Sequence, residues 1–545
     1  MKTALYKALK YVAFPTALVG AGIFIGFTIR QIYADPHARD ATNVAKIDEV
    51  IRYIKDYYFQ VPDEKKMIDD AIVGMLNGLD PHTFYIPAED LKQVNEQMQG
   101  SFEGIGVEFS IVDDTLLVVA PIAGGPSERL GIESGDRIVK INSENVAGIG
   151  ITNQEVMKRL RGPKGTHVKV SIKRQGEKEL LEFDIERDKI PIYSVDYSYM
   201  VNKETGYIKV SRFAETTMTE FLEHLNKLKS KGMQNLILDL RGNPGGYLER
   251  AKQMADVFLS DGKLIVYTEG RTAGTNKKYH ATNLLNEFEQ GGLIVLINQG
   301  SASASEIVSG AVQDWDRGLV IGTRSFGKGL VQQQYTLSDQ SAIRVVVSRY
   351  FTPSGRCIQK PYDKGGKEYE KEILERWESG EIFDETKIKL PDSLKYKTNA
   401  GRTVYGGGGI IPDVFAAPDT SGGSKYFNSL RQKALFNKFA FRYSEQHPEI
   451  KARFKDGFDY AANFYVSDEL LNEFVKFASE KGVAYNESDF NKSKKLIAQN
   501  VKMQLGRTYF GDDGMYPVWL ENDNVFQKAL SYMDRAKKLE KTGKF

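Results

Sequence analysis

The stretch LIVLINQGSASASEIVSGAVQDWDRGLVI, residues 293–321, decides the fold. It opens on the apolar run 293–297, crosses small residues into a helical pattern that ends near Trp315, and returns to an apolar run. A short apolar run without alternation is typical of a strand buried on both faces. The same order occurs upstream, where the run LILDL at 236–240, apolar except for Asp239, precedes a helical pattern at 247–258. The sequence therefore predicts an α/β layered core.

The small residues 298–306 join the buried strand to the helix and place a serine hydroxyl at the helix N-terminus. Backbone N–H groups at such a terminus favour developing negative charge, so the segment is a candidate source of the nucleophile, and the family resemblance described below implies that this is Ser303. A serine at this junction is also a common helix cap. The segment alone leaves both roles open.

The candidate base is Lys328, which lies between two glycines. A lysine with an ordinary pKa of ~10.4 is neutral in only about one molecule in a few thousand at pH 7, so a lysine base needs desolvation without a paired acid. No Asp or Glu occurs in residues 317–338. Gln332 lies four residues after Lys328 and shares its face in a helix or a strand. We expect Gln332 to orient the neutral amine.

A third segment, DLRGNPGG at residues 239–246, runs from a strand into a glycine-rich turn. Backbone N–H groups in such a turn are free to point at an oxyanion. The predicted donors are the N–H groups of Gly245 and Ala304.

A β-rich module begins near Ser101, where the apolar residues start to alternate. The sequence GIGV at 104–107 precedes the first alternating strand, and its glycines let N–H groups converge on an anion. With GIESGDRI at 131–138, this region resembles a PDZ domain over about residues 98–188. A PDZ domain adds a peptide C-terminus as a strand beside the one that follows this loop. The residues expected to bind the carboxylate are Gly104, Ile105, Gly106 and Val107.

Taken together, the chain resembles the carboxyl-terminal processing, or tail-specific, serine peptidases. The motifs follow the family's order over about residues 45–415: LDPH at 79–82, the PDZ insert, 239–246, 300–306, FGKG at 326–329 with Gln332, and GIIPD at 409–413. The resemblance implies a crotonase-like core and a dyad of Ser303 and Lys328, helped by Gln332. It also implies cleavage near the C-terminus of proteins that the PDZ domain delivers. Leu330 departs from the family, which more often has a small hydroxyl residue there.

The fold class expected is thus an α/β multidomain protein with an inserted PDZ domain and helical N- and C-terminal segments. The last segment carries no recognisable chemistry and is expected to serve packing or oligomerisation. The predicted parts are a signal peptide or anchor at 1–35, a helical segment at 36–97, the PDZ domain at 98–188, the α/β core at 189–420 and a helical domain at 421–545.

The N-terminus predicts export. Lys2, Lys7 and Lys10 precede the uncharged residues 12–28, which are long for a signal peptide and slightly short for a membrane span. Cleaved signal and retained anchor both stay open. Either places the rest of the chain in the cell envelope, on the periplasmic side.

Composition narrows the partners. The formal net charge is +2, which provides no field for nucleic acid. The single cysteine and the scattered histidines offer no metal-ligand spacing, so we expect neither metal nor cofactor. The expected partners are protein substrates with apolar C-terminal tails, and a homo-oligomer is an open alternative.

Three other interpretations compete. Residues 322–329 nearly match a phosphate loop, but Gly329 replaces the hydroxyl residue that binds Mg²⁺ and a strand pattern follows. Ser325 with Lys328 spells the S-x-x-K of penicillin-binding enzymes, but the flanking glycines argue against its helix. The third is a non-catalytic PDZ scaffold or chaperone on a peptidase-like core.

Overall fold

The computed structural model describes residues 41–285, 287–363, 365–388 and 392–544. The chain divides into two compact units, residues 1–75 and 76–545. The first contains helix α2 (Ala41–Tyr57) and most of helix α3 (Glu64–Asn77), in agreement with the helical spacing of this region. The predicted signal or anchor, 1–35, lies outside the described residues. Among the helices that are described, none is both long and apolar enough to cross a membrane.

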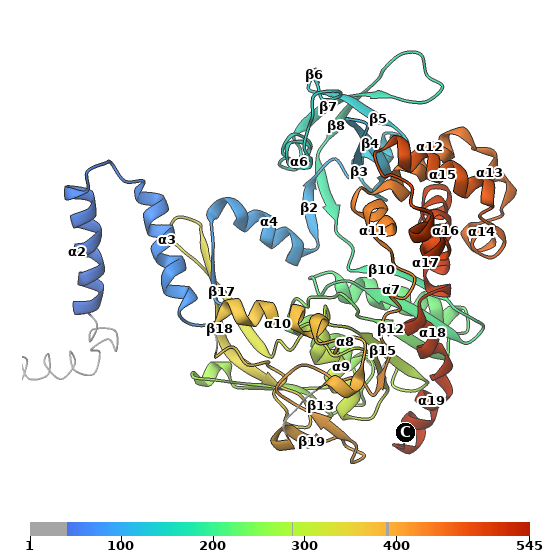
Figure 1. The fold of residues 1–545 in the computed structure, drawn as a ribbon. Coiled ribbons are helices and arrows are strands. Elements are labelled where there is room, and N and C mark those ends of the chain that lie inside the picture. The colour runs from blue at the N-terminus through green and yellow to red at the C-terminus, as the bar shows by residue number, and fades with distance from the viewer. Residues whose placement is uncertain (1–40, 286, 364, 389–391, 545) are drawn as a thin grey trace, which may run out of the picture. The chain divides into compact units, whose positions relative to one another are not determined.

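A sheet of six strands forms the centre of the second unit (Figure 1). Neighbouring strands are parallel from β11 to β21, and β10 is antiparallel to β11. Every residue of β12, β15 and β16 is buried. This confirms the α/β core with buried strands. The strand order is β10 (Val195–Met200), β11 (Thr205–Val210), β12 (Asn235–Asp239), β15 (Leu293–Ile297), β16 (Leu319–Gly322) and β21 (Val414–Phe415).

Helices cover both faces of this sheet. Leu236 and Leu238 pack on one face against helices from the middle of the chain, and Ile237 packs on the other against the last helices. Successive side chains of a strand point to opposite faces, so an apolar strand needs cover on both sides. The first group is α7 (Thr217–Ser230), α8 (Leu248–Asp256) and α9 (Ala304–Asp314), and the second is α17 (Asp512–Glu521), α18 (Asn524–Ser531) and α19 (Met533–Thr542).

A second sheet carries the segment that follows Lys328. Its strand order is β1, β18, β13, β14, with β17 paired to β18. Strand β1 belongs to the predicted helical segment 36–97 but pairs with β18, so the core begins earlier than the sequence indicates. The bounds are β1 (Phe84–Ile86), α4 (Ala88–Gln99), β13 (Leu264–Gly270), β14 (Lys277–His280), β17 (Leu330–Thr336), β18 (Ala342–Phe351), α10 (Gly366–Glu378), β19 (Lys395–Lys397) and β20 (Thr403–Tyr405).

The PDZ-like module has its own sheet and its own apolar core. Strand β3 lies at the edge of this sheet and, among the strands of the described residues, pairs with β4 alone. A separate pair, β2 with β9, joins the two ends of the module. The elements are β2 (Ser101–Gly104), β3 (Val107–Val112), β4 (Thr115–Pro121), α5 (Pro126–Arg129), β5 (Arg137–Ile141), β6 (Glu144–Asn145), α6 (Asn153–Leu160), β7 (His167–Lys173), β8 (Leu181–Glu186) and β9 (Asp188–Pro191).

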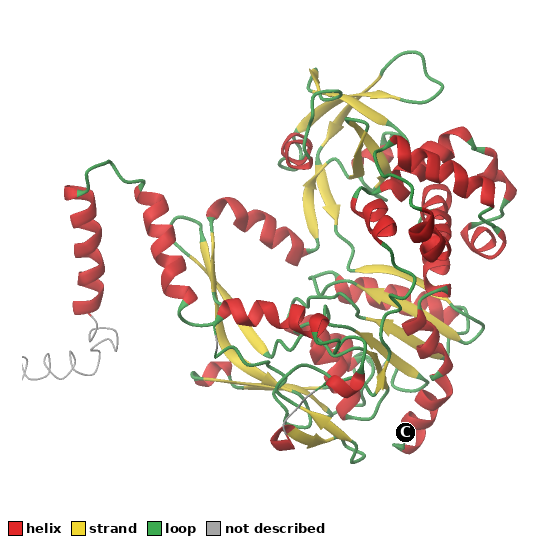
Figure 2. Cartoon of the chain, viewed as in Figure 1, coloured by secondary structure: helices red, strands yellow, loops and turns green. Residues whose placement is uncertain are grey.

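The C-terminal segment is helical as predicted (Figure 2), but it does not form one domain. Residues 426–510 surround an aromatic core of their own, whereas the helices after them pack on the central sheet. We call the first part, α11 to α16, the helical domain. Its helices are α11 (Lys425–Gln432), α12 (Leu435–Gln446), α13 (Glu449–Arg453), α14 (Gly457–Asn463), α15 (Asp468–Glu480) and α16 (Glu487–Phe510).

This packing predicts that the final helices stabilise the α/β core. Phe526 is 2% exposed and its ring meets that of Tyr207 on β11 edge to face. Phe526→Ala should lower the free energy of unfolding by about 3–5 kcal/mol, measured by chemical denaturation, because it leaves a cavity against the sheet. Tyr465→Ala is the control, since Tyr465 is 81% exposed. Equal effects of the two substitutions would contradict this packing.

Candidate active site

Ser303 lies after strand β15, directly before the first residue of helix α9. It is the N-cap residue of that helix, with φ 54° and ψ −110°. Ordinary caps have negative φ, and a residue other than glycine in this region stores backbone strain. The cap position expected from the sequence is therefore correct, but its geometry is that of a strained residue at the mouth of a helix.

The segment 298–306, which contains Ser303, is hydrogen-bonded to the glycine-rich turn 239–246. The side chain of Asn298 accepts a hydrogen bond of 2.8 Å from the N–H of Gly242. From the nucleophile segment, the hydroxyls of Ser301 and Ser305 donate to the carbonyl oxygens of Leu240 (2.8 Å) and Asn243 (2.9 Å). The small polar residues of 298–306 thus bind the glycine-rich turn 239–246, and this fixes both segments.

A buried carboxylate links Ser303 to Lys328. Glu306 is fully buried, and its Oε2 accepts from the N–H of Ser303 at 2.8 Å and from the N–H of Lys328 at 2.9 Å. Its Oε1 accepts from the N–H of Gly327 at 2.8 Å and from the hydroxyl of Ser325. Burial raises the pKa of Glu306, and these bonds oppose that rise. One side chain therefore sets the spacing of two loops far apart in sequence.

The amine of Lys328 points at the residue predicted to orient it. Its Nζ lies 2.7 Å from Oε1 of Gln332. The amide nitrogen of Gln332 donates in turn to the carbonyl oxygen of His82, which fixes which end of the amide faces the lysine. Among the described residues, Lys328 Nζ has its hydrogen bond with Gln332 and not with Ser303. Hydrogen bonds between a base and its nucleophile are often long without substrate.

The surroundings of Lys328 favour its neutral form. Burial lowers the pKa of Lys328 to about 8, and the charge of Arg344 adds to this, whereas Glu306 and Asp80 oppose it. An amine with such a pKa is neutral in about one molecule in ten at pH 7. The acid-free stretch in the sequence thus has the consequence expected, although two distant carboxylates weaken it.

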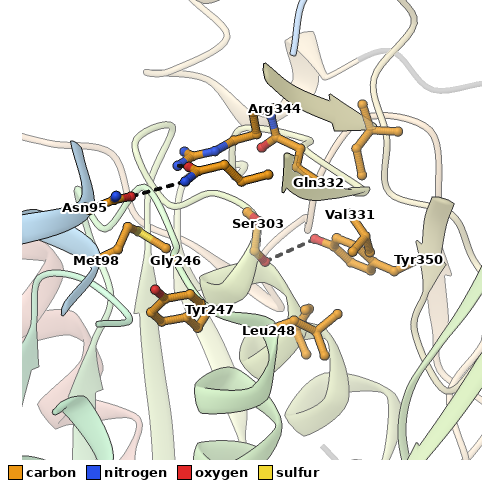
Figure 3. A pocket seen from close by; sticks show the side chains of 13 residues that line it. Asn95, Met98, Gly246, Tyr247, Leu248, Ser303, Val331, Gln332, Arg344 and Tyr350 are labelled. Carbon is orange, nitrogen blue, oxygen red and sulfur yellow. Dashed lines mark hydrogen bonds between the residues drawn. The ribbon is translucent and has the colours of Figure 1, made fainter. Parts of the chain in front are cut away.

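Ser303 opens into a pocket lined by residues of strands β17 and β18 of the second sheet, of helices α4, α8 and α9, and of the glycine-rich turn (Figure 3). Gln332 and Arg344 line it together with Gly246, and Figure 3 shows the ring of Tyr350 directed at Ser303. The Tyr350 hydroxyl lies 3.0 Å from the carbonyl oxygen of Ser303 and 2.7 Å from that of Lys328. Tyr350 is thus a second link between the two loops.

The structure corrects one of the two predicted oxyanion donors. The N–H of Gly245 donates to Oδ1 of Asn243 at 2.9 Å and is not free. Gly246 follows it, lines the pocket, and has no described acceptor for its N–H, and the same is true of the Ala304 N–H at the start of α9. A Cβ on Gly246 would lie 2.1 Å from the carbonyl oxygen of Phe213, so only glycine fits there. In the described structure, the N–H of this turn that is free at the pocket is thus that of Gly246, one residue later than predicted.

The predicted tail-binding residues lie together on the turn between β2 and β3. Gly104 ends β2, Val107 begins β3, and Gly106 has φ 75°. The carbonyl oxygen of Ile105 in this turn accepts a hydrogen bond of 2.6 Å from the hydroxyl of Ser127. Within the described part of the chain, no acceptor lies within hydrogen-bonding distance of the N–H of Ile105 or Gly106. The turn therefore has two backbone donors without a described partner.

The two competing enzyme motifs fail on local structure. Residues 330–336 form strand β17, not the helix that a phosphate loop requires. Ser325 is fully buried, and its hydroxyl donates to Glu306 while accepting from the N–H of Ile410 at 2.6 Å. It has no access to a substrate.

Sequence reasoning missed the part that His82 plays. The carbonyl oxygen of His82 accepts a hydrogen bond from the side-chain amide of Gln332, and Nε2 of its ring lies 2.7 Å from the Tyr369 hydroxyl. Burial lowers the pKa of His82 to about 4. From the sequence, His82 has no assigned role beyond its place in the LDPH motif at 79–82. The signal for a site role was the LDPH motif, where Asp80 holds the turn through the N–H of His82 at 2.7 Å.

Three family models match the chain. The model of peptidase family S41 matches residues 204–365, and a PDZ domain model matches 117–174. A model of a family of unknown function matches 426–511, which coincides with the helical domain.

Curated relatives match over much of their length. A carboxy-terminal-processing protease of Bartonella bacilliformis is 36% identical over 347 residues, 62% of this chain and 79% of that protein. The carboxy-terminal processing protease CtpB of Bacillus subtilis is 34% identical over 354 residues, 63% of this chain and 73% of that protein.

The geometry predicts that Glu306 is needed to align Ser303. In Glu306→Gln an amide N–H₂ replaces one acceptor oxygen and meets two donors. The rate at which a fluorophosphonate labels Ser303 should fall about 100-fold, since small misplacements of reacting groups cost that much. Labelling would be followed by mass spectrometry, with circular dichroism to verify folding.

Glu223→Gln is the matched control, because Glu223 is exposed on α7. Ser325→Ala removes only one donor to Glu306 and should reduce labelling less than Glu306→Gln. Normal labelling of a folded Glu306→Gln protein would contradict the role assigned to this carboxylate.

Proposed function

Because the chain belongs to the carboxy-terminal processing proteases of peptidase family S41, serine-type peptidases with a PDZ domain, we propose that Ser303 and Lys328 are its catalytic dyad and that the PDZ domain recruits protein substrates by their C-terminal tails. The observation that carries the dyad is Glu306, whose one carboxylate oxygen binds the N–H groups of both residues. The core that holds them is proposed to be crotonase-like.

The first half of the reaction forms an acyl-enzyme. Neutral Lys328 takes the proton of the Ser303 hydroxyl as Oγ attacks the scissile carbonyl carbon. The carbonyl oxygen becomes an oxyanion, for which the N–H groups of Gly246 and Ala304 are the proposed donors. Collapse of this intermediate breaks the C–N bond, and protonated Lys328 gives its proton to the leaving amine.

The second half returns the enzyme to its starting state. Lys328, neutral again, takes a proton from water, and the hydroxide attacks the ester carbon. The Ser303 oxygen leaves, recovers its proton from Lys328, and the new carboxyl terminus is released. Gln332 accepts from Nζ throughout, which directs the lone pair of the amine away from itself. This is why Gln332 is included in the site.

The PDZ domain supplies selectivity in this proposal. The carboxylate of a tail binds the free N–H groups of the Gly104–Val107 turn, and the tail adds as a strand to the unpaired edge of β3. Apolar tail residues then lie against the half-buried Val107 and Phe109, which pack on the PDZ core. An upstream segment of the same substrate enters the Ser303 pocket.

Substitution of the dyad tests the mechanism. Ser303→Ala should abolish cleavage of a peptide with an apolar C-terminus, and Lys328→Met should lower kcat at least about 1,000-fold, because each removes a group that reacts. Products are identified by mass spectrometry. Ser230→Ala and Lys227→Met, on the core helix α7 away from the pocket, should cleave normally. Undiminished turnover in either dyad variant rejects the proposal, and tail binding without any cleavage by the native chain favours the scaffold alternative.

The pH profile tests the base. A lysine base works deprotonated, so kcat/KM should rise with pH and level off above a midpoint near pH 8, the pKa of Lys328. Arg344→Met removes a positive charge that lowers this pKa, and the midpoint should move up. Arg349→Met, five residues along β18 and on its opposite face, should leave the midpoint unchanged. An acid optimum, or a midpoint that Arg344→Met does not move, would count against Lys328 as the base.

A further inference from the structure

The edge strand of the PDZ sheet faces the helical domain. Arg507 of α16 pairs with Glu108 of β3 at 2.8 Å, and Lys481, which follows α15, pairs with Asp113 in the turn after β3. On the PDZ side, Arg137 pairs with Glu445 of α12 at 3.5 Å. These ion pairs join the two modules along β3.

A groove lies between them at the far end of β3. Its PDZ wall consists of Phe109, Ser110 and Ile111 of β3 with Asn153 at the start of α6. Its other wall is the α11–α12 corner with Lys433, Lys438 and Lys481. We call this the basic groove.

The charges of the basic groove are unbalanced. Lys481 is neutralised by Asp113, the one acidic group that the groove lysines reach in the described structure. Lys433 donates to the carbonyl oxygen of Gly482 at 2.9 Å, which is not a counter-charge. Lys438 is half-buried, and its side chain has no hydrogen bond or ion pair with a described residue, although its charge contributes to the lowered pKa of Asp113. Other acids nearby are engaged elsewhere: Glu155 caps α6 at Thr152 and Glu480 pairs with Arg442. Among the described residues, Lys433 and Lys438 therefore have no carboxylate in direct ion-pair contact.

The direction of a bound tail brings it to this groove. A tail that places its carboxylate at the Gly104–Val107 turn and pairs antiparallel with β3 runs toward Val112 as it is followed upstream. Ile111 lies four residues after Val107. Residues about four to six positions before the substrate's C-terminus therefore reach the basic groove.

We propose that the basic groove, formed jointly by β3 and the helical domain, recognises acidic side chains about four to six residues upstream of a substrate's C-terminus through Lys433 and Lys438. This rests on the tail binding proposed above and adds a substrate class to it: proteins whose apolar tails follow an acidic segment. It also gives the helical domain a role in substrate choice.

The test is tail binding to the full chain carrying Ser303→Ala, which cannot cleave its ligand. Two fluorescent peptides share the same three apolar C-terminal residues and differ at positions four to six from the end, which are Glu in one and Gln in the other. Fluorescence anisotropy gives both dissociation constants. The acidic peptide should bind about 5- to 20-fold more tightly at low salt, as two partly exposed ion pairs allow, and the preference should shrink with added salt.

Charge removal in the groove tests its position. Lys433→Gln with Lys438→Gln should abolish the preference and leave the Gln peptide's affinity unchanged. The matched control is Lys451→Gln with Lys476→Gln, exposed lysines of the same domain outside the groove, which should keep the preference.

The outcomes separate the two levels of the proposal. Equal binding of the two peptides, or a preference that survives loss of Lys433 and Lys438, overturns the role of the groove while tail binding stands. If amidation of the C-terminus leaves the binding of both peptides unchanged, the PDZ turn does not bind tails, and the tail proposal and the groove fall together.

Discussion

The carboxylate of Glu306 is the constraint on which the site depends. Ser303 and Lys328, the proposed nucleophile and base, lie on two loops that share a direct backbone hydrogen bond, of 2.9 Å, from the N–H of Phe326 to the carbonyl oxygen of Ser301. A buried carboxylate is costly unless hydrogen bonds satisfy it. Glu306 meets that requirement with four donors, and these belong to both loops. The need to satisfy one buried charge therefore helps to hold the backbones of Ser303 and Lys328 together.

The same carboxylate also works against the lysine that it positions. Its charge raises the pKa of Lys328, as does that of Asp80, yet burial outweighs both. The compromise is geometric: Glu306 binds the backbone N–H of Lys328, while the amine projects to Gln332. The Glu306 carboxylate thus binds the main chain of Lys328, and the uncharged amide of Gln332 binds its amine. A carboxylate at Gln332 would pair with the ammonium and keep it protonated.

The sequence was sufficient for features that depend on local pattern. Uninterrupted apolar runs predicted the buried strands, and the glycines flanking Lys328, with no acid nearby in sequence, predicted a lysine of lowered pKa. Features that depend on distant partners were missed. Glu306 lies inside the nucleophile motif, but its meaning comes from residues 19 to 22 positions later. Likewise, in the described structure the N–H of Gly245 is occupied, and that of Gly246 is not, because the Asn243 side chain turns toward Gly245 and accepts its hydrogen bond.

The largest miss concerns the C-terminal segment, whose uniform helical pattern hides two different attachments. Its last helices are part of the α/β core, where Asp523 pairs with Arg241 at 2.6 Å and Arg241 in turn binds the fully buried Asp239. This series of ion pairs ends at Asp239, which directly precedes the turn that contains Gly246. In sequence, the helical domain lies between the strands of the α/β core and the last helices, α17 to α19, which pack on that core. Both of its ends are therefore connected to the α/β core. Two such connections restrict the movement of the helical domain, and a less mobile wall of the basic groove contributes more to the proposed substrate choice because less entropy is lost on binding.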